Sequence, residues 1–245
     1  MTARTEVDVW LVVSDVDDTL TGDRDALFHL WSVLRDAEEP IRFVLNSSRP
    51  ARSVDETIRD YFPQDFSPDA IITGLGTEIR IGGALLTEWA ARFENWPRQE
   101  IVDLVEDFGH APHPDVFQTP AKASFAVPDE RAVERLLEVL SQRGLPFRAI
   151  YSGASDLDLI APGAGKDAAL LFLAKHFSAG PGRVIAAGDS GNDLAMFEAA
   201  DRAIAVGNAR RELRYAAPRH KTYFARADHA AGVLEGLQAY GVLPS

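Results

Sequence analysis

Apolar runs alternate with amphipathic stretches through most of the chain, and this alternation limits the possible folds more than any other feature. The runs that predict buried strands are VDVWLVVSD, IRFVLNS, DAIITG, RVIAAGD and RAIAVGN. Between the first two, apolar residues recur at helical spacing, as at Leu27, Leu30 and Leu34. Strands that alternate with helices predict an α/β fold, in which helices cover both faces of a parallel sheet.

Residues 84–162 follow a different pattern. Two helical stretches, PRQEIVDLVEDFGHA and DERAVERLLEVLSQRG, lie among the short strand-like pieces KASFAV, PFRAIYS and DLDLIAP. Glycines flank this part on both sides, at Gly82–Gly83 and in APGAG, and are typical of hinges. We therefore expect a core formed by residues 1–83 and 163–245, with a smaller α+β insertion at residues 84–162.

The composition excludes several classes of partner and site. A net charge of −12 argues against binding to nucleic acid or to an anionic membrane surface. No apolar run approaches the ~18 residues of a membrane span, and the N-terminus lacks the apolar segment of a signal peptide, so we expect a cytoplasmic protein. The absence of cysteine excludes disulfides and thiolate metal sites. His110 and His113 show no metal-binding spacing and are interpreted as surface residues, and the sequence leaves the oligomeric state open.

Three polar clusters, SDVDDT, NSSR and GDSGND, each follow a predicted strand. The carboxyl ends of parallel strands lie along one edge of a sheet, and ligands collect there. The side chains expected at this shared edge are those of Asp15, Asp17, Ser47 and Asp189.

Asp15 and Asp17 are two positions apart, so their side chains are expected to point the same way. Adjacent carboxylates repel each other unless a cation or a shared proton relieves them. A few carboxylates with waters and a substrate phosphate form a site typical of Mg2+. A polar turn after the strand is the alternative interpretation. Asp189 and Asp193 form a second acidic pair, in which Asp193 could instead cap a helix.

Lys166 begins a predicted helix, where the helix dipole disfavours a cation. A lysine that faces an anion explains this placement, and a solvated surface lysine is the alternative. The segment APGAGK is not a P-loop, because Ile160 stands where the first glycine belongs and Asp167 replaces the serine or threonine. The hydroxyl of Ser47 could donate to a phosphate oxygen or cap a turn.

Taken in order, DVDDT, NSSR, Lys166 and GDSGND resemble the four signature elements of the haloacid dehalogenase-like (HAD) phosphatases. The insertion resembles a type C2 cap, and the resemblance implies a Rossmann-like core. ITGLGTEI, KASF, SGASDLDLIAPGAGKDAAL and AAGDSGNDLAMF are similar to the sucrose-phosphate phosphatase branch, which includes enzymes that act on mannosylfructose phosphate.

The resemblance implies a role for each matching residue. Asp15 would be the nucleophile that forms an aspartyl phosphate, and Asp17 the general acid and then the general base. Ser47, Lys166 and Asn192 would bind the phosphoryl group. The cofactor would be Mg2+, and its expected ligands are Asp15, Asp17 through its backbone carbonyl, Asp189 and Asp193.

Sugar recognition is expected from the cap and its junction with the core. The candidate residues are Glu78, Lys122, Ser152 and Asp158, although Glu78 and Asp158 could instead face water. The chain departs from the sucrose-phosphate phosphatase pattern at Asp18, Leu20 and Ser48, where that branch has Asn, Trp and Gly.

The sequence thus predicts a Mg2+-dependent phosphatase of a phosphorylated disaccharide or related glycosyl phosphate. Alternatives within the same chemistry are mannosyl-3-phosphoglycerate and hexose phosphates. A sugar-phosphate sensor without catalysis would not need Asp15, Asp17, Lys166 and Asp189 all intact. A glycosyltransferase with a D-x-D metal site would leave Lys166 and the second acidic cluster without a role.

Overall fold

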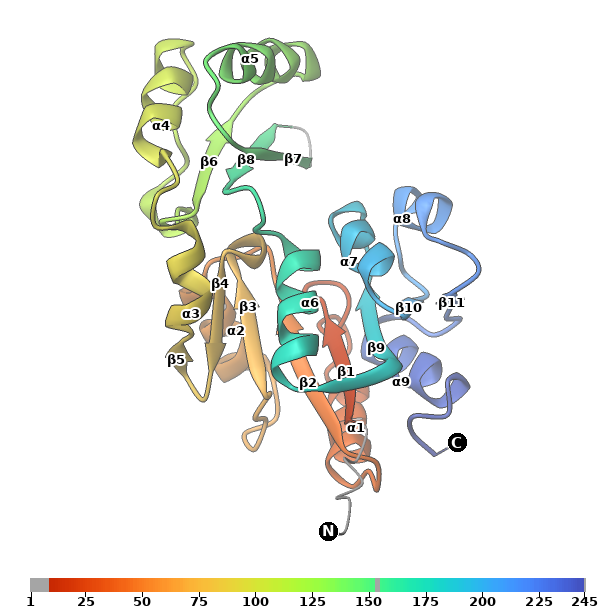
Figure 1. Ribbon diagram of the computed structural model, residues 1–245. Coiled ribbons are helices and arrows are strands. Elements are labelled where there is room, and N and C mark those ends of the chain that lie inside the picture. Colours follow the sequence, from red (N-terminus) through yellow and green to blue (C-terminus); the bar gives the residue numbers. More distant parts are fainter. Residues whose placement is uncertain (1–8, 153–154, 245) are drawn as a thin grey trace.

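The computed structural model describes residues 9–152 and 155–244 and contains two β-sheets (Figure 1). The first third of the chain forms β1 (Val9–Ser14), α1 (Arg24–Arg35), β2 (Ile41–Asn46), α2 (Ala51–Tyr61), β3 (Ala70–Thr73), η1 (Gly74–Gly76), β4 (Glu78–Ile81), β5 (Ala84–Leu85), α3 (Thr87–Ala90) and η2 (Ala91–Phe93). The middle forms α4 (Arg98–Asp107), η3 (Asp115–Phe117), β6 (Lys122–Ala126), α5 (Glu130–Gln142), β7 (Arg148–Ser152) and β8 (Asp156–Ile160). The last third forms α6 (Lys166–His176), β9 (Ala179–Gly188), η4 (Gly191–Asp193), α7 (Leu194–Ala199), β10 (Arg202–Ala205), α8 (Arg211–Ala216), β11 (Thr222–Phe224) and α9 (His229–Ala239).

The large sheet has the strand order β11-β10-β9-β1-β2-β3-β4-β5. The strands from β11 to β3 are parallel, whereas β4 and β5 are antiparallel to their neighbours. β1 is central because its apolar run VWLVVS is buried on both faces. Helices α1 and α9 pack together on one face, and α6 and α7 on the other (Figure 1). The α/β fold predicted from the alternation is therefore confirmed.

The small sheet, β6-β8-β7, is antiparallel and packs against α4 and α5. One face of β6 and β8 carries Ala123, Phe125, Leu157 and Leu159, which are buried against these helices. The alternation of strand side chains places Lys122, Ser124, Asp156 and Asp158 on the opposite face. KASFA and DLDLI therefore turn their polar residues away from the helices.

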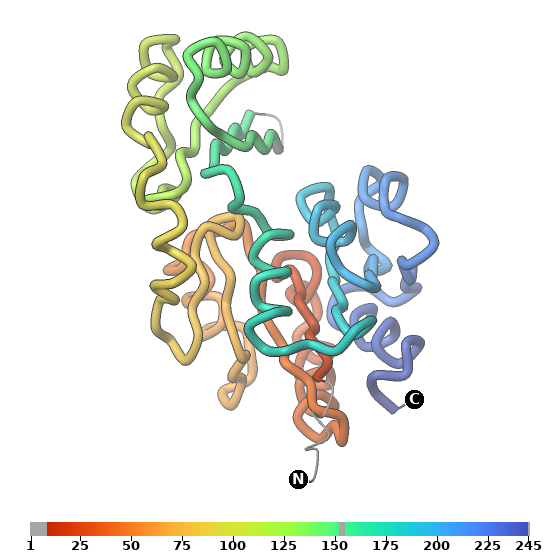
Figure 2. Tube along the Cα trace, viewed as in Figure 1, coloured from red at the N-terminus to blue at the C-terminus, as the bar shows by residue number. Residues whose placement is uncertain are grey.

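The chain leaves the large sheet after η2 and returns to it at α6 (Figure 2). Residues 84–93 still belong to the large sheet's core, because β5 pairs with β4 and the ring of Trp89 packs 5.0 Å from that of Phe172 on α6. The insertion expected to begin at residue 84 is therefore better placed from about Pro97, the residue before α4, and we propose this boundary. No helix in the described ranges has the length and apolar character of a membrane span.

Candidate active site

The ends of β9, β1 and β2 lie side by side because these strands are adjacent and parallel. Asp15 follows β1, and its backbone N–H donates to the carbonyl of Ala187 on β9 at 2.9 Å. Ser47 follows β2, and its N–H donates to the carbonyl of Ile72 on β3 at 2.9 Å. Asp189 follows β9 directly. The sheet topology therefore gathers the three polar clusters at one edge.

Lys166, the first residue of α6, lies at the centre of this edge. Its ammonium Nζ lies 2.5 Å from Asp15 Oδ1, 2.7 Å from Asp193 Oδ1 and 3.1 Å from Asn192 Oδ1. The side chain of Lys166 is only 2% exposed, so the sequence alternative of a solvated surface lysine is wrong. The backbone carbonyl of Lys166 accepts a hydrogen bond from Asn46 Nδ2 at 3.1 Å, which ties α6 to the end of β2.

Gly76, in η1, brings the backbone of that turn directly against the start of α6. Its φ is +82°, and a Cβ on it would collide with the carbonyl group of Gly165 and approach the backbone nitrogen of Lys166. The indole Nε1 of Trp89 donates to the Gly76 carbonyl at 3.1 Å and holds the turn in place. Only glycine combines this conformation with so close an approach.

Asp15, Asp189 and Asp193 form a buried group in which one carboxylate oxygen from each residue lies within 4.8 Å of the other two. Asp193 already has both oxygens engaged, since Oδ1 contacts Lys166 and Oδ2 accepts from the backbone N–H groups of Asp189 and Ser190 at 3.1 and 3.2 Å. Asp15 and Asp189 are therefore the carboxylates better placed to bind a cation directly. Hard oxygen donors with excess negative charge fit Mg2+.

Burial and neighbouring charges shift the pKa values of these side chains. Burial raises the pKa of Asp15 to about 8, and the adjacent Lys166 opposes this rise. Burial and the nearby charge of Asp193 raise the pKa of Asp189 to about 6. Burial alone would lower the pKa of Lys166, but Asp15 and Asp193 outweigh it and raise that pKa above its usual value. One ammonium thus faces more carboxylate charge than it can neutralise.

Asp17 lies outside the three-carboxylate group, and its side chain is half-exposed. Its Oδ2 lies 2.7 Å from Nε of Arg49, whose Nη1 donates to Ser53 and Thr57 on α2 at 3.1 and 3.0 Å. The sequence reasoning missed Arg49, although it closes the NSSR element that the reasoning had singled out. The ion pair fixes Asp17 at the mouth of the site.

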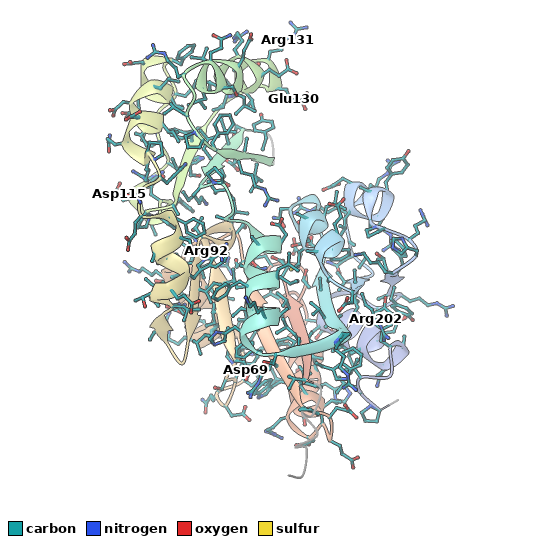
Figure 3. All side chains as sticks on the ribbon, in the orientation of Figure 1. Asp69, Arg92, Asp115, Glu130, Arg131 and Arg202 are labelled. Atoms are coloured by element: carbon teal, nitrogen blue, oxygen red, sulfur yellow. The ribbon has the colours of Figure 1, made fainter. Side chains whose placement is uncertain are left out.

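A cavity of about 690 Å³ opens onto this edge of the sheet. Its lining residues are Asp15, Asp17, Asp18, Ser48, Glu130, Ile150, Tyr151, Asp189, Ser190, Gly191, Asn192, Arg210 and Glu212. Glu130 begins α5 in the inserted part (Figure 3), and Ile150 lies on β7. The cavity is therefore bounded by both the large-sheet core and the small sheet.

A second cavity, of about 260 Å³, adjoins the polar face of the small sheet. Lys122 and Asp158 line it as a buried pair, with Nζ and Oδ1 3.1 Å apart, so Asp158 does not face water freely. His113 also lines it and contacts Asp156 at 3.1 Å, and its side chain is 27% exposed, so it lies only partly at the surface.

The remaining candidates are placed differently. Glu78 accepts a hydrogen bond from Thr73 Oγ1 at 3.0 Å and lines neither cavity. Ser47 is fully buried, and its Oγ accepts from the N–H of Arg49 at 3.1 Å, whereas Ser48 lines both cavities. Ser152 ends β7, but its side chain lies outside the described part of the structure.

Comparisons with known proteins find relatives among sugar-phosphate phosphatases. Mannosylfructose-phosphate phosphatase from Agrobacterium fabrum is 31% identical over 96% of this chain and 98% of its own length. Sucrose-phosphatase 1 from Nicotiana tabacum is 30% identical over 96% of this chain, which spans only 60% of the tobacco protein. For a second tobacco protein, sucrose-phosphatase 2, the share spanned is 51%, so the chain spans about half to three fifths of these plant relatives.

Solved structures show the same relationship. The sucrose-phosphatase from Synechocystis, solved in complex with sucrose and phosphate, superposes with a TM-score of 0.84 at 29% identity, covering 96% of this chain and 99% of that one. A haloacid dehalogenase-like hydrolase from Bacillus subtilis shares the fold, with a TM-score of 0.69 at 18% identity over 96% of each chain. The sequence profile of the sucrose-6F-phosphate phosphohydrolases matches residues 9–241. The chain therefore belongs to the sucrose-6F-phosphate phosphohydrolase family.

Proposed function

We propose that this protein is a Mg2+-dependent phosphatase that hydrolyses a phosphorylated disaccharide or related glycosyl phosphate. The observation that carries the proposal is the buried contact of Lys166 with Asp15 and Asp193, next to Asp189 at the same edge of the sheet. Relatives named for sucrose phosphate and mannosylfructose phosphate support the substrate class.

In the proposed reaction, a carboxylate oxygen of Asp15 attacks phosphorus and the bond from phosphorus to the sugar oxygen breaks. Asp17 donates a proton to the leaving sugar oxygen, then accepts one from the water that hydrolyses the aspartyl phosphate. Inorganic phosphate leaves and Asp15 is restored. Arg49 would hold Asp17 in place for both proton transfers.

The residues around the nucleophile would neutralise the negative charge of the phosphoryl group. The ammonium of Lys166 would offset the negative charge of the phosphoryl group, and Asn192 would help to orient that ammonium. Asp15 and Asp189 would hold Mg2+, with the backbone carbonyl of Asp17 as a further ligand, and the ion would supply charge neutralisation at the phosphoryl oxygens. Asp193 would position Lys166 and the loop that carries Asp189.

Ser47 is proposed as a phosphoryl contact through its hydroxyl, which must turn from its present hydrogen bond with the Arg49 amide. Lys122 and Asp158 are the proposed sugar contacts, because they line the second cavity on the face of the small sheet. Glu78 and Ser152 remain candidates that rest on the family resemblance.

The test is phosphate release from a panel of substrates with MgCl2 present: sucrose 6-phosphate, mannosylfructose phosphate, mannosyl-3-phosphoglycerate and hexose phosphates. A disaccharide phosphate should give the highest kcat/KM. Asp15→Asn should lower kcat by about 10³-fold or more, because the amide cannot form the acyl phosphate. Asp25→Asn, an exposed aspartate in the first turn of α1, is the matched control. Phosphate release by Asp15→Asn at the rate of this control would refute the mechanism.

A further inference from the structure

Arg210 lies beside the carboxylate group from the loop that precedes α8. Its guanidinium Nε is 3.7 Å from Asp189 Oδ2, and its Nη2 is 3.7 Å from Asp18 Oδ2. The side chain of Asp189 is 5% exposed, whereas those of Arg210 and Asp18 are 59% and 58% exposed. One solvent-accessible cation therefore bridges a buried carboxylate and an exposed one.

Backbone contacts hold both members of this bridge. The N–H of Arg210 donates to the carbonyl of Asp189 at 2.7 Å, which fixes the root of the arginine beside the end of β9. The carbonyl of Asp18 accepts from Asn208 Nδ2 at 2.7 Å and lies 2.9 Å from His229 Nδ1. Asp18 has a φ of 56°, a conformation that Asp and Asn adopt more readily than other residues with a side chain.

The charges around the large cavity are unequal. Its described lining carries the carboxylates of Asp15, Asp17, Asp18, Glu130, Asp189 and Glu212, and the guanidinium of Arg210 is the one cationic group in that lining. Arg210 approaches Asp189 at Oδ2, while Oδ1 accepts a long hydrogen bond of 3.5 Å from Thr19. A divalent ion bound by Asp189 would lie close to this guanidinium and would be repelled by its positive charge.

We propose that Arg210 and Asp18 form a charge couple that sets the affinity of the Asp15–Asp189 site for Mg2+. Arg210 competes with the metal for Asp189, and Asp18 draws the guanidinium aside and adds its own attraction for the ion. Asp18, one of the positions where the chain departs from the sucrose-phosphate phosphatase pattern, thereby acts on the metal. The inference rests on the proposed metal site and is independent of which sugar phosphate is hydrolysed.

The experiment is calorimetric titration of MgCl2 into the metal-stripped full chain, without substrate. Arg210→Ala should lower the Kd for Mg2+ about three- to tenfold, the size expected for a partly exposed charge near a buried one. Arg210→Lys should stay near the wild type because it keeps the cation. Asp18→Asn, which preserves the backbone conformation, should raise the Kd about threefold or more.

Arg211→Ala is the matched control. Arg211 is the adjacent exposed arginine and makes no ion pair within the described chain, so its replacement removes the same charge without breaking the proposed couple. Asp18→Asn should weaken binding less in the Arg210→Ala background, because no guanidinium is then released onto Asp189. In 1 M choline chloride, where the Debye length is about 3 Å, the gain in Arg210→Ala should shrink.

Equal Kd values for Arg210→Ala and Arg211→Ala would overturn the couple and leave the proposed phosphatase intact. A wild-type protein that releases phosphate yet shows no Mg2+ binding would overturn the couple together with the metal part of the proposed function.

Discussion

Lys166 shows how much a single side chain can hold in place at this site. Its ammonium contacts Asp15, Asp193 and Asn192 in a setting almost closed to water. A buried ion pair adds little net stability, but removal of one partner leaves uncompensated buried charge. Lys166 is therefore both a proposed reactant contact and a structural counter-ion.

Replacement of Lys166 by methionine should abolish phosphate release and lower the free energy of unfolding of the metal-free protein by about 3 kcal/mol. The physical reason is that Asp15 and Asp193 lose the cation shared between them. Urea titration followed by circular dichroism measures the stability change. Lys175→Met, an exposed position on the same helix, is the control, and equal stability of the two variants would contradict the prediction.

The placement of Asp15, Ser47 and Asp189 at one edge follows from the sequence because strand ends are short-range signals, whereas the place of Lys166 beside them came from the family resemblance. The contacts of Arg49 and Arg210 could not be predicted in the same way. Both contacts depend on the direction in which a loop points a long side chain. The partners are also distant in sequence: Arg49 contacts Asp17, and Arg210 contacts Asp18 and Asp189.

At the scale of elements, the small sheet presents a charged pair on one face and apolar residues on the other. Lys122 on β6 and Asp158 on β8 lie 3.1 Å apart and are both nearly buried. Such a pair can exchange its internal contact for hydroxyl groups of a ligand without a large change in burial. The proposed sugar contact is therefore a property of two neighbouring strands.

Replacement of Lys122 by methionine should raise the KM for the preferred disaccharide phosphate about tenfold or more, since Asp158 is left without its cation and the sugar loses a donor. The kcat for p-nitrophenyl phosphate, which lacks a sugar, should change less than about twofold. Steady-state kinetics on both substrates measures the difference. An equal loss on the two substrates would show that the pair supports the fold rather than the sugar.

In the large sheet, strands with long apolar runs could be predicted, whereas the short strands at or near its edges could not. β1, β2, β3, β9 and β10 coincide with predicted strands because each is a buried parallel strand with a nearly continuous apolar sequence. β4 (EIRI), β5 (AL) and β11 (TYF) lie at or near the two edges of the sheet, where shorter and more polar sequences suffice. The missed β4 and β5 also underlie the later start that we propose for the insertion.

For the whole molecule, the excess of buried carboxylate charge links stability to metal and pH. Without metal, the pKa of Asp15 is about 8 and that of Asp189 about 6, both above the value of 3.8 expected after unfolding. The folded state therefore retains protons that the unfolded state releases. The stabilisation from this retention is complete below about pH 4 and is lost as the pH rises through 6 and 8.

Chelation of the metal should consequently lower Tm more at about pH 8.5 than at about pH 5.5. The gap should reach several degrees, because a chain of this length shifts by about 2–4 °C per kcal/mol. Scanning calorimetry with MgCl2 or EDTA at the two pH values measures it. In Asp15→Asn the pH dependence of the gap should be reduced, and an equal effect of EDTA at both pH values in the wild type would contradict the explanation.

The glycine contact between η1 and the start of α6 has a consequence for genetic surveys of this protein. Gly76 touches no proposed reactant, yet any side chain there would displace the backbone that carries Lys166. In a library scored only for enzyme output, Gly76 would rank beside the nucleophile. Parallel scores for protein abundance and for metal retention would separate substitutions at Gly76 from those at the nucleophile. Gly76 is needed because its lack of a side chain lets two segments pack closely, although Gly76 and Lys166 are 90 residues apart in the sequence.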